Sequence, residues 1–223
     1  MLEEALKSGV EIGAVLVSEE VEREWALESP IYVLPRALFR EIATTETPQG
    51  IIALVRPRTF EIGHVLAGRA ILLDGIQDPG NAGAIVRATE AFGGSGVVFL
   101  KSTVSPYNPK CLRASAGSLF RLPFVNHPEP DAVRQAITAC GVALYAAMPD
   151  ARRSIEDVDW SKPGAILIGS EGRGVSSEWS AIATHIRIPT TGVESLNAAV
   201  AAAVILYEAR KRLTIGLDPM RFT

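Results

Sequence analysis

Three polar segments in the last two thirds of the chain combine groups that hold anions or hydroxyls. The first segment, residues 78–87, has a Pro-Gly turn before Asn81 and ends at Arg87. We expect Asn81 to cap a helix on which Gly83 and Arg87 share a face. Because a glycine inside a helix costs ~1 kcal/mol relative to alanine, Gly83 is expected to leave room beside the guanidinium. An ordinary cap followed by a salt-bridged arginine is the alternative.

The second segment, residues 169–175, has three glycines in six residues around the carboxylate of Glu171. Glycines let backbone amides approach a ligand closely, so Gly169, Gly172 and Gly174 indicate a binding loop. The spacing is G-x-x-G-x-G, which differs from the G-x-G-x-x-G of dinucleotide-binding loops, and no lysine of a phosphate-binding loop follows. A purely structural turn is the alternative.

The third segment, residues 189–197, contains Ser195 and Asn197 and leads into an alanine-rich stretch. Ser195 is a natural cap for the helix predicted to follow. The small side chains of Ala198–Ala203 would let backbone or ligand approach closely. The alternative is that alanine is present here only because it is a good helix former.

These segments follow short apolar runs that alternate with helical stretches. Near-continuous apolar strands between helices predict an α/β fold with a parallel sheet covered on both faces. Ligands bind beyond the carboxyl ends of such strands, where the three segments are expected to lie. The predicted strands are Ile71–Leu73, Val97–Leu100, Val142–Ala147, Ala165–Gly169 and Ile186–Pro189, and the predicted helices are Ala82–Phe92, Ala132–Ala139 and Ser195–Leu213.

The first part of the chain has the same alternation on a smaller scale. We predict a small α/β domain there, followed by a linker at 56–68, where two glycines and a proline interrupt any period. This gives domains at 1–65 and 66–223. The predicted helices of the small domain are Leu2–Lys7, Val21–Leu27 and Arg36–Ile42, and its strands are Ile12–Val17, Ile31–Leu34 and Ile51–Val55.

Composition places the chain among globular proteins. Its 223 residues are 48% hydrophobic and 21% charged, which suits one or two domains with a core. The longest apolar run is far shorter than the ~20 residues that span a bilayer, and no signal pattern opens the chain. We therefore expect a cytoplasmic protein with no membrane partner. Cys111 and Cys140 lack metal-ligand spacing, so both are interpreted as buried thiols and no metal is expected.

The net charge of −3 counts modestly against a nucleic-acid partner, since such proteins usually carry a basic patch. Four cations nevertheless fall between residues 101 and 121 with no acid among them: Lys101, Lys110, Arg113 and Arg121. This stretch predicts a local basic face, although a solvated loop would look the same.

Taken in order, the segments Asn81-x-Gly83-x-x-x-Arg87, Gly169-x-Glu171-Gly172-x-Gly174 and Ile188-Pro189 with Ser195-Leu196-Asn197 resemble the three signature motifs of the SpoU/TrmH RNA ribose methyltransferases. The resemblance covers 70–212. It departs from the usual pattern at Thr190 and Ala198, where the family more often has an apolar residue and a valine.

The resemblance implies a knotted parallel α/β domain, known as the SPOUT fold, whose C-terminal segment forms a deep trefoil knot. It also implies a homodimer that uses S-adenosyl-L-methionine and acts on structured RNA, with ribosomal RNA preferred and transfer RNA possible. The cofactor would be bound by Gly169, Gly174, Ile188 and Leu196. Small side chains after Ala198 suit the crowded site of a knot, a rare exception to the rule against them.

By the same resemblance, Arg87 activates the ribose 2′-hydroxyl, while Asn81, Glu171, Ser195 and Asn197 orient the arginine and the ribose. An arginine is almost always protonated, so an open alternative is that Arg87 clamps phosphate and hydroxyl while the proton leaves by another route. Alignment of oxygen, methyl and sulfur is expected to supply most of the catalysis.

The first domain is similar to the substrate-binding domain that often precedes this catalytic domain. Family members usually start with a further strand, so the chain is expected to have a shortened or truncated N-terminus. Three other functions are alternatives: a non-catalytic RNA-binding or ribosome-assembly protein with the same fold, a nucleotide-dependent oxidoreductase, and a methyltransferase that modifies a base nitrogen. The glycine spacing argues against the oxidoreductase.

Overall fold

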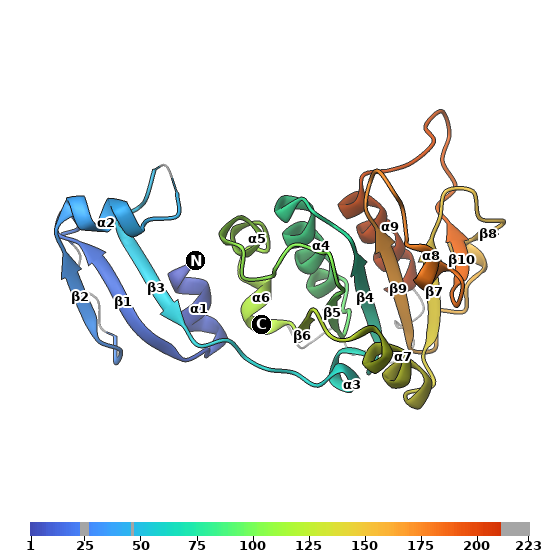
Figure 1. Cartoon of the computed structure of the whole chain (residues 1–223), viewed down its shortest axis with the longest axis horizontal. Helices are drawn as coiled ribbons and strands as arrows, with labels where there is room; N and C mark the ends of the chain where they lie inside the picture. Colours follow the sequence, from blue (N-terminus) through green and yellow to red (C-terminus); the bar gives the residue numbers. More distant parts are fainter. Residues whose placement is uncertain (23–26, 46, 211–223) are drawn as a thin grey trace. The chain divides into compact units, whose positions relative to one another are not determined.

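The protein is described by a computed structural model that covers residues 1–22, 27–45 and 47–210. The chain divides into two compact units, Met1–Arg58 and Thr59–Thr223 (Figure 1). Each unit has its own sheet. No helix within the described ranges is long and apolar enough to cross a membrane.

The first unit is a three-stranded mixed sheet with two helices. Strand β1 (Ile12–Ser18) lies in the middle, parallel to β2 (Ile31–Leu34) and antiparallel to β3 (Ile51–Val55). Helices α1 (Leu2–Ser8) and α2 (Arg36–Ile42) each bury one side chain in a core shared with alternate residues of β1. The predicted small α/β domain is therefore confirmed. The helix predicted at Val21–Leu27 lies largely outside the described residues.

The second unit is built on a seven-stranded sheet with the order β6-β5-β4-β9-β7-β10-β8. Every neighbouring pair of strands is parallel, which confirms the predicted parallel α/β fold. The strands are β4 (Arg69–Asp74), β5 (Gly96–Phe99), β6 (Phe124–Asn126), β7 (Ala143–Ala147), β8 (Arg153–Ser154), β9 (Gly164–Gly169) and β10 (Thr184–Arg187).

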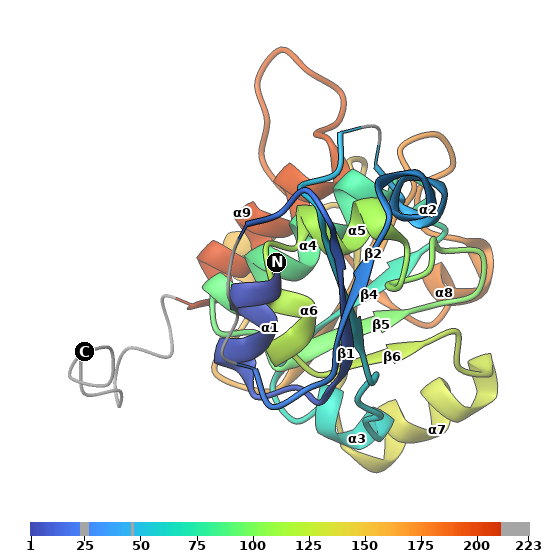
Figure 2. The same ribbon diagram turned by 90° about the vertical axis from the view of Figure 1, so that its left-hand side faces the viewer.

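Helices cover both faces of this sheet, as the apolar strands predict. Alternate residues of β4 belong to different cores: Ile71 and Leu73 pack with α4 and α9, whereas Ala70 and Leu72 pack with α7 and α8. Figure 2 shows these layers on either side of the sheet. The helices are α3 (Ile62–Val65), α4 (Pro79–Ala91), α5 (Pro109–Ala114), α6 (Ser118–Arg121), α7 (Pro130–Ala139), α8 (Ser177–Ser180) and α9 (Ala198–Arg210), with a 3₁₀ turn η1 at Ile155–Asp157.

Several short elements escaped the sequence prediction. Helix α3 lies within the stretch interpreted as a linker, and its Val65 is fully buried in the core of the second unit. Helices α5, α6 and α8 and strands β6 and β8 were also missed, because segments of two to six residues show too little periodicity. The predicted trefoil knot stays a prediction.

A buried arginine ties the end of α9 to the start of the central strand β4. Arg69 is only 4% exposed, and its Nη1 donates to the carbonyl of Ala209 at 2.6 Å. Burial lowers the pKa of Arg69. A cation beside the last carbonyls of a helix satisfies acceptors that have no partner within the helix. Arg69 therefore helps to fix α9, whose N-terminal end lies at the site described next.

Candidate active site

A cavity of about 280 Å³ lies beyond the carboxyl ends of β9, β7 and β10. The four residues predicted to hold a cofactor, Gly169, Gly174, Ile188 and Leu196, all line it. Three of the five residues predicted to act in catalysis also line it, namely Glu171, Ser195 and Asn197. The structure therefore brings the second and third segments together around one space.

The loop after β9 folds back on itself because Gly169 has no side chain. A Cβ built at Gly169 would lie 2.0 Å from the carbonyl carbon of Gly174 and 2.2 Å from the amide nitrogen of Val175. Ser170 and Gly174 then form a β-bridge that closes the turn, and Gly174 has a φ of 66°, in the left-handed region. The glycines thus create the loop that carries Glu171.

Three polar side chains from the three segments form a directed hydrogen-bond network. Asn197 Oδ1 accepts from the amides of Ala199 at 2.9 Å and Val200 at 3.3 Å, so its Nδ2 points away from the helix. That Nδ2 donates to Asn81 Oδ1 at 3.1 Å, and the Nδ2 of Asn81 donates to Oε1 of Glu171. The order of donors is fixed because only the oxygen of Asn197 can accept from helix amides.

Two predicted helix caps are wrong. Helix α9 begins three residues later than expected, and Asn197, rather than Ser195, receives the amides of its first turn. Helix α4 begins at Pro79 with Asp78 as its cap, which accepts from the amide of Asn81 at 2.7 Å. A proline suits the first position of a helix because its missing N–H needs no partner there. Asn81 is consequently free to use its side chain in the network.

The expected role of Gly83 is also wrong. A Cβ at Gly83 would lie 2.4 Å from the carbonyl oxygen of Cys111 and 2.6 Å from Cβ of Ala114. This glycine therefore lets α5 pack against α4 and does not make room for Arg87. Arg87 is exposed, and it has no hydrogen bond or ion pair within residues 1–22, 27–45 and 47–210. The structure does not bring it into contact with the Asn81 network.

The remaining sequence predictions concern the cysteines and the basic stretch. Burial raises the pKa of Cys111 to about 12, so this thiol stays protonated. Cys140 is exposed, so the interpretation of both thiols as buried was half wrong. Arg121 pairs with Glu90 at 2.6 Å, which neutralises one of the four cations of the predicted basic face. Among the described residues, no three His, Cys, Asp or Glu side chains cluster as metal ligands.

The sequence did not reveal the part of the cavity that follows β7. Ala147 and Met148 line the cavity there, and β7 lies next to β9 in the sheet. Their position at the end of an apolar strand is the one signal available, because alanine and methionine suggest no chemistry. Together, the walls combine apolar side chains with backbone groups, and the carboxylate of Glu171 at the edge is held by the amide of Asn81, which Asn197 holds in turn.

Two family profiles cover most of the chain. Residues 68–207 match the SpoU rRNA Methylase family, and residues 1–53 match the MRM3-like substrate binding domain. The first match covers more than half of the 223 residues.

Relatives and solved structures agree with these profiles. A 23S rRNA (guanosine(2553)-2′-O)-methyltransferase, RlmP of Bacillus subtilis, is 34% identical over 94% of this chain and 85% of its own length. A 23S rRNA (uridine(2479)-2′-O)-methyltransferase of Streptomyces viridochromogenes is 33% identical over 82% of this chain and 68% of its own.

Among solved structures, the SpoU methyltransferase AviRb of Streptomyces viridochromogenes in complex with S-adenosylmethionine superposes with a TM-score of 0.84 at 27% identity, covering 96% of this chain and 88% of that one. An S-adenosylmethionine-bound rRNA methyltransferase of Sinorhizobium meliloti gives a TM-score of 0.81 at 28% identity, covering 95% of this chain and 84% of that one.

Proposed function

The chain belongs to the SpoU rRNA methylase family, and on this premise we propose that it transfers the methyl group of S-adenosylmethionine to a ribose 2′-hydroxyl in ribosomal RNA. The observation that carries the proposal is the network of Asn81, Glu171 and Asn197, which joins three distant segments at the edge of one cavity. A protein that only bound RNA would have no need to hold a carboxylate there.

The cavity suits S-adenosylmethionine in its chemistry. Ala147, Ile168 and Ile188 give it apolar walls for the adenosine, while Gly169 and Leu196 present backbone groups. Small side chains at Ala198 and Ala201 on α9 allow close approach. Two carboxylates, Glu171 and Glu194, line the same space, which favours a ligand with positive charge. When bound, this cofactor supplies an electrophilic methyl group on a sulfonium.

Glu171 is the side chain best placed to accept a hydrogen bond from the ribose hydroxyl. A carboxylate has about four acceptor sites, and one of them is occupied by Asn81. The remaining sites can accept a hydrogen bond from the 2′-hydroxyl and hold it in line for displacement. The amides at the N-terminus of α9 orient the side chain of Asn197, and Asn197 then orients Asn81 through a hydrogen bond. Asn81 orients Glu171 in the same way.

Arg87 is proposed to bind the RNA phosphate next to the methylated ribose. Its guanidinium is exposed and has no protein partner in the described ranges, as a phosphate ligand requires before RNA binds. Arg87 follows Asn81 by six residues on α4, a rise of about 9 Å along the helix. It therefore acts beside the network and not within it. Arg87→Ala should abolish methylation and leave cofactor affinity nearly unchanged; loss of both would mean that Arg87 is structural.

We also propose that the protein works as a homodimer through the outer face of α9. This helix is apolar up to its last turn, which is typical of a buried helix, yet Val200 is 48% exposed and Tyr207 is 44% exposed. The two residues are seven apart, so they lie on the same face. A second copy covering this face would remove both side chains from water and would bring its own α9 near the cofactor cavity.

The first unit is proposed to select a structured RNA, as the name of its matching domain family suggests. RNA is recognised largely through shape, exposed loops and 2′-hydroxyls. Removing Met1–Arg58 should lower RNA affinity while cofactor binding survives, since the two units are separately compact. Unchanged RNA affinity would remove this part of the proposal. By similarity to its bacterial relatives, the protein is also proposed to act in the cytoplasm.

The function is tested by mapping ribose methylation in cells. Mass mapping of ribosomal RNA from cells with and without this protein should show one 2′-O-methylated nucleotide that is lost in the deletion and restored by the wild-type gene. Restoration by a gene carrying Glu171→Gln would contradict the role of the network. A change confined to transfer RNA would move the substrate to that class of RNA.

A further inference from the structure

A second cavity of about 280 Å³ lies beside the first at the same edge of the sheet. It lies beyond the carboxyl ends of β5, β4 and β9, whereas the first cavity lies beyond those of β9, β7 and β10. Ser170 and Gly174 line both spaces, so the turn after β9 is their common wall. Ligands of open parallel sheets bind along this edge, and here the edge is divided into two chambers.

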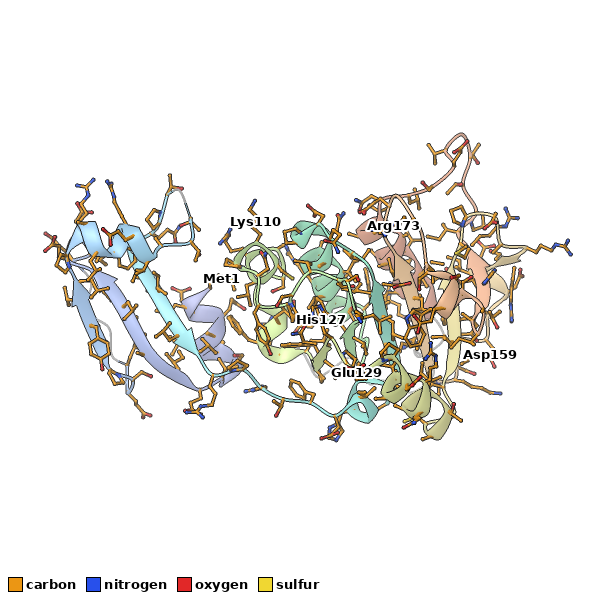
Figure 3. All side chains as sticks on the ribbon, viewed as in Figure 1. Met1, Lys110, His127, Glu129, Asp159 and Arg173 are labelled. Atoms are coloured by element: carbon orange, nitrogen blue, oxygen red, sulfur yellow. The ribbon has the colours of Figure 1, made fainter. Side chains whose placement is uncertain are left out.

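The second cavity differs from the first in its chemistry. Lys101 follows β5 and Arg173 lies on the turn after β9, so two cations from distant segments line one space. Figure 3 labels Arg173, which extends from the turn after β9. Neither cation has a hydrogen bond or ion pair within the described parts of the chain. Cations without a protein partner at a cavity wall favour an anionic ligand such as a phosphate ester.

Two carboxylates also line the second cavity: Glu178, which pairs with Arg134, and Asp74 on its floor. Asp74 ends β4, is only 9% exposed, and accepts from the amide of Ser176 at 2.6 Å through one oxygen. A carboxylate offers about four acceptor sites, so Asp74 keeps capacity for N–H donors inside the cavity. Apolar walls are supplied by Leu100 and Trp179, both almost fully buried. Cations, an acceptor and apolar walls together match a nucleotide, which has phosphate, N–H donors and a flat base.

One strained residue lines the same space. Ser102 has a φ of 67°, in the left-handed region, which is costly for a serine, and such residues cluster at binding sites. Gly75 and Gly174 also line the cavity with φ angles of 71° and 66°, which glycine adopts without strain.

We propose that this second cavity receives the nucleotide whose ribose is methylated, with Lys101 and Arg173 on its 5′-phosphate and Asp74 facing its base. The phosphate assigned to Arg87 is then the one on the 3′ side of the same ribose. The inference rests on the proposed function and assigns the substrate to its own chamber. The turn after β9 then separates the cofactor from the nucleotide. The two ligands meet only at Glu171, which lies on this turn and lines the first cavity. The ribose lies over the wall, and the base and phosphate lie beyond it.

Direct binding of single nucleotides tests the proposal without knowledge of the RNA. The probes are the four nucleoside 5′-monophosphates and inorganic phosphate, each added at millimolar concentration to the full chain and followed by ligand-observed NMR. At least one nucleotide should bind better than phosphate. The double variant Lys101→Ala/Arg173→Ala should weaken that binding by about tenfold or more, since it removes both charge-assisted hydrogen bonds to the phosphate.

The matched control removes one lysine and one arginine that line neither cavity. Arg152 and Lys162 are both exposed, so Arg152→Ala/Lys162→Ala should bind the nucleotide as the wild type does. Affinity for S-adenosylhomocysteine, measured by calorimetry, should stay within about twofold in both double variants, because their residues are absent from the first cavity.

Three results would overturn the proposal: no nucleotide binds the wild type, phosphate binds as well as every nucleotide, or the Lys101→Ala/Arg173→Ala variant binds like the control. Failure of the proposed function is a different result. In that case the nucleotide binds and depends on Lys101 and Arg173, but the wild-type protein transfers no methyl group to ribosomal RNA.

Discussion

The two cavities at the carboxyl edge differ in how their walls are assembled. The first is lined mainly by small and apolar residues from a few segments, and close backbone contacts at Gly169 shape it. The second is lined by two cations and a buried carboxylate from loops far apart in the chain. The shape of the first cavity is set by closely packed backbone. The second cavity would instead recognise its ligand through separate charged side chains. Changes to the shared wall should therefore have larger effects than changes to either chamber alone.

The largest effect is expected for Gly169→Ala. Its Cβ would meet backbone atoms at 2.0–2.3 Å, so the turn must move, and overpacking of this kind costs ~1–3 kcal/mol. We expect cofactor affinity to fall by about tenfold to a hundredfold and nucleotide affinity to fall with it. Calorimetric titration with S-adenosylhomocysteine measures the first effect. Gly172→Ala is the matched control, because nothing lies within 4 Å of its Cβ and the variant should bind normally.

A more selective effect, confined to the methyl-transfer step, is expected for Asn81→Ala. This change frees Glu171 and removes the acceptor of Asn197, but Asn81 does not line the cofactor cavity. The single-turnover rate of methylation should fall by about a hundredfold, in the range of a misplaced acid-base group. Cofactor affinity should change little. A parallel loss of cofactor affinity would mean that the network supports the cavity and does not orient the ribose.

We also expect ligand binding at the two cavities to respond differently when the proposed dimer is disrupted. Val200→Asp places a charge on the exposed face of α9, two residues after Ala198 of the cofactor cavity. Sedimentation should show a monomer, with cofactor affinity reduced and binding of single nucleotides at the second cavity retained. The control Val193→Asp alters a valine that is 55% exposed on the preceding loop and should leave the dimer intact. A dimeric Val200→Asp protein would assign the interface to another face.

The smallest effect concerns stability away from both chambers. The hydrogen bond from Arg121 lowers the pKa of Glu90, so the folded state binds its proton less tightly than the unfolded chain. This stabilisation is present above the unfolded pKa of Glu and is lost as the pH falls through the lower folded pKa. Glu90→Gln should cost about 0.5 kcal/mol at pH 7, and the difference should shrink below about pH 4 in urea unfolding. A constant difference would exclude the ion pair as its source.

Sequence alone identified residues that line the first chamber and missed the second chamber. Gly169, Ile188 and Leu196 lie in contiguous motifs after apolar strands, so a pattern along the chain could identify them. Lys101 and Arg173 come together only because β5, β4 and β9 are neighbours in the sheet. Strand order is decided by tertiary packing, which a local pattern does not contain.

The mistaken helix caps have a similar cause. Asn81 and Ser195 are both good capping residues, but Asp78 and Asn197 take those roles. Local propensity cannot decide between several candidates within three residues. In the folded chain, the side chain of Asn81 donates to Glu171 and does not cap the helix. These two residues are 90 positions apart in the sequence, so a local pattern does not contain their contact.

Methylation of a ribose hydroxyl beside Glu171 can be measured with purified components. Unmodified 23S ribosomal RNA is incubated with the full chain and isotope-labelled S-adenosylmethionine, then digested to nucleosides and analysed by mass spectrometry. The account predicts a single labelled 2′-O-methylnucleoside with the wild-type protein and almost none with Glu171→Gln. Label on a base, or equal ribose label with the variant, would contradict it.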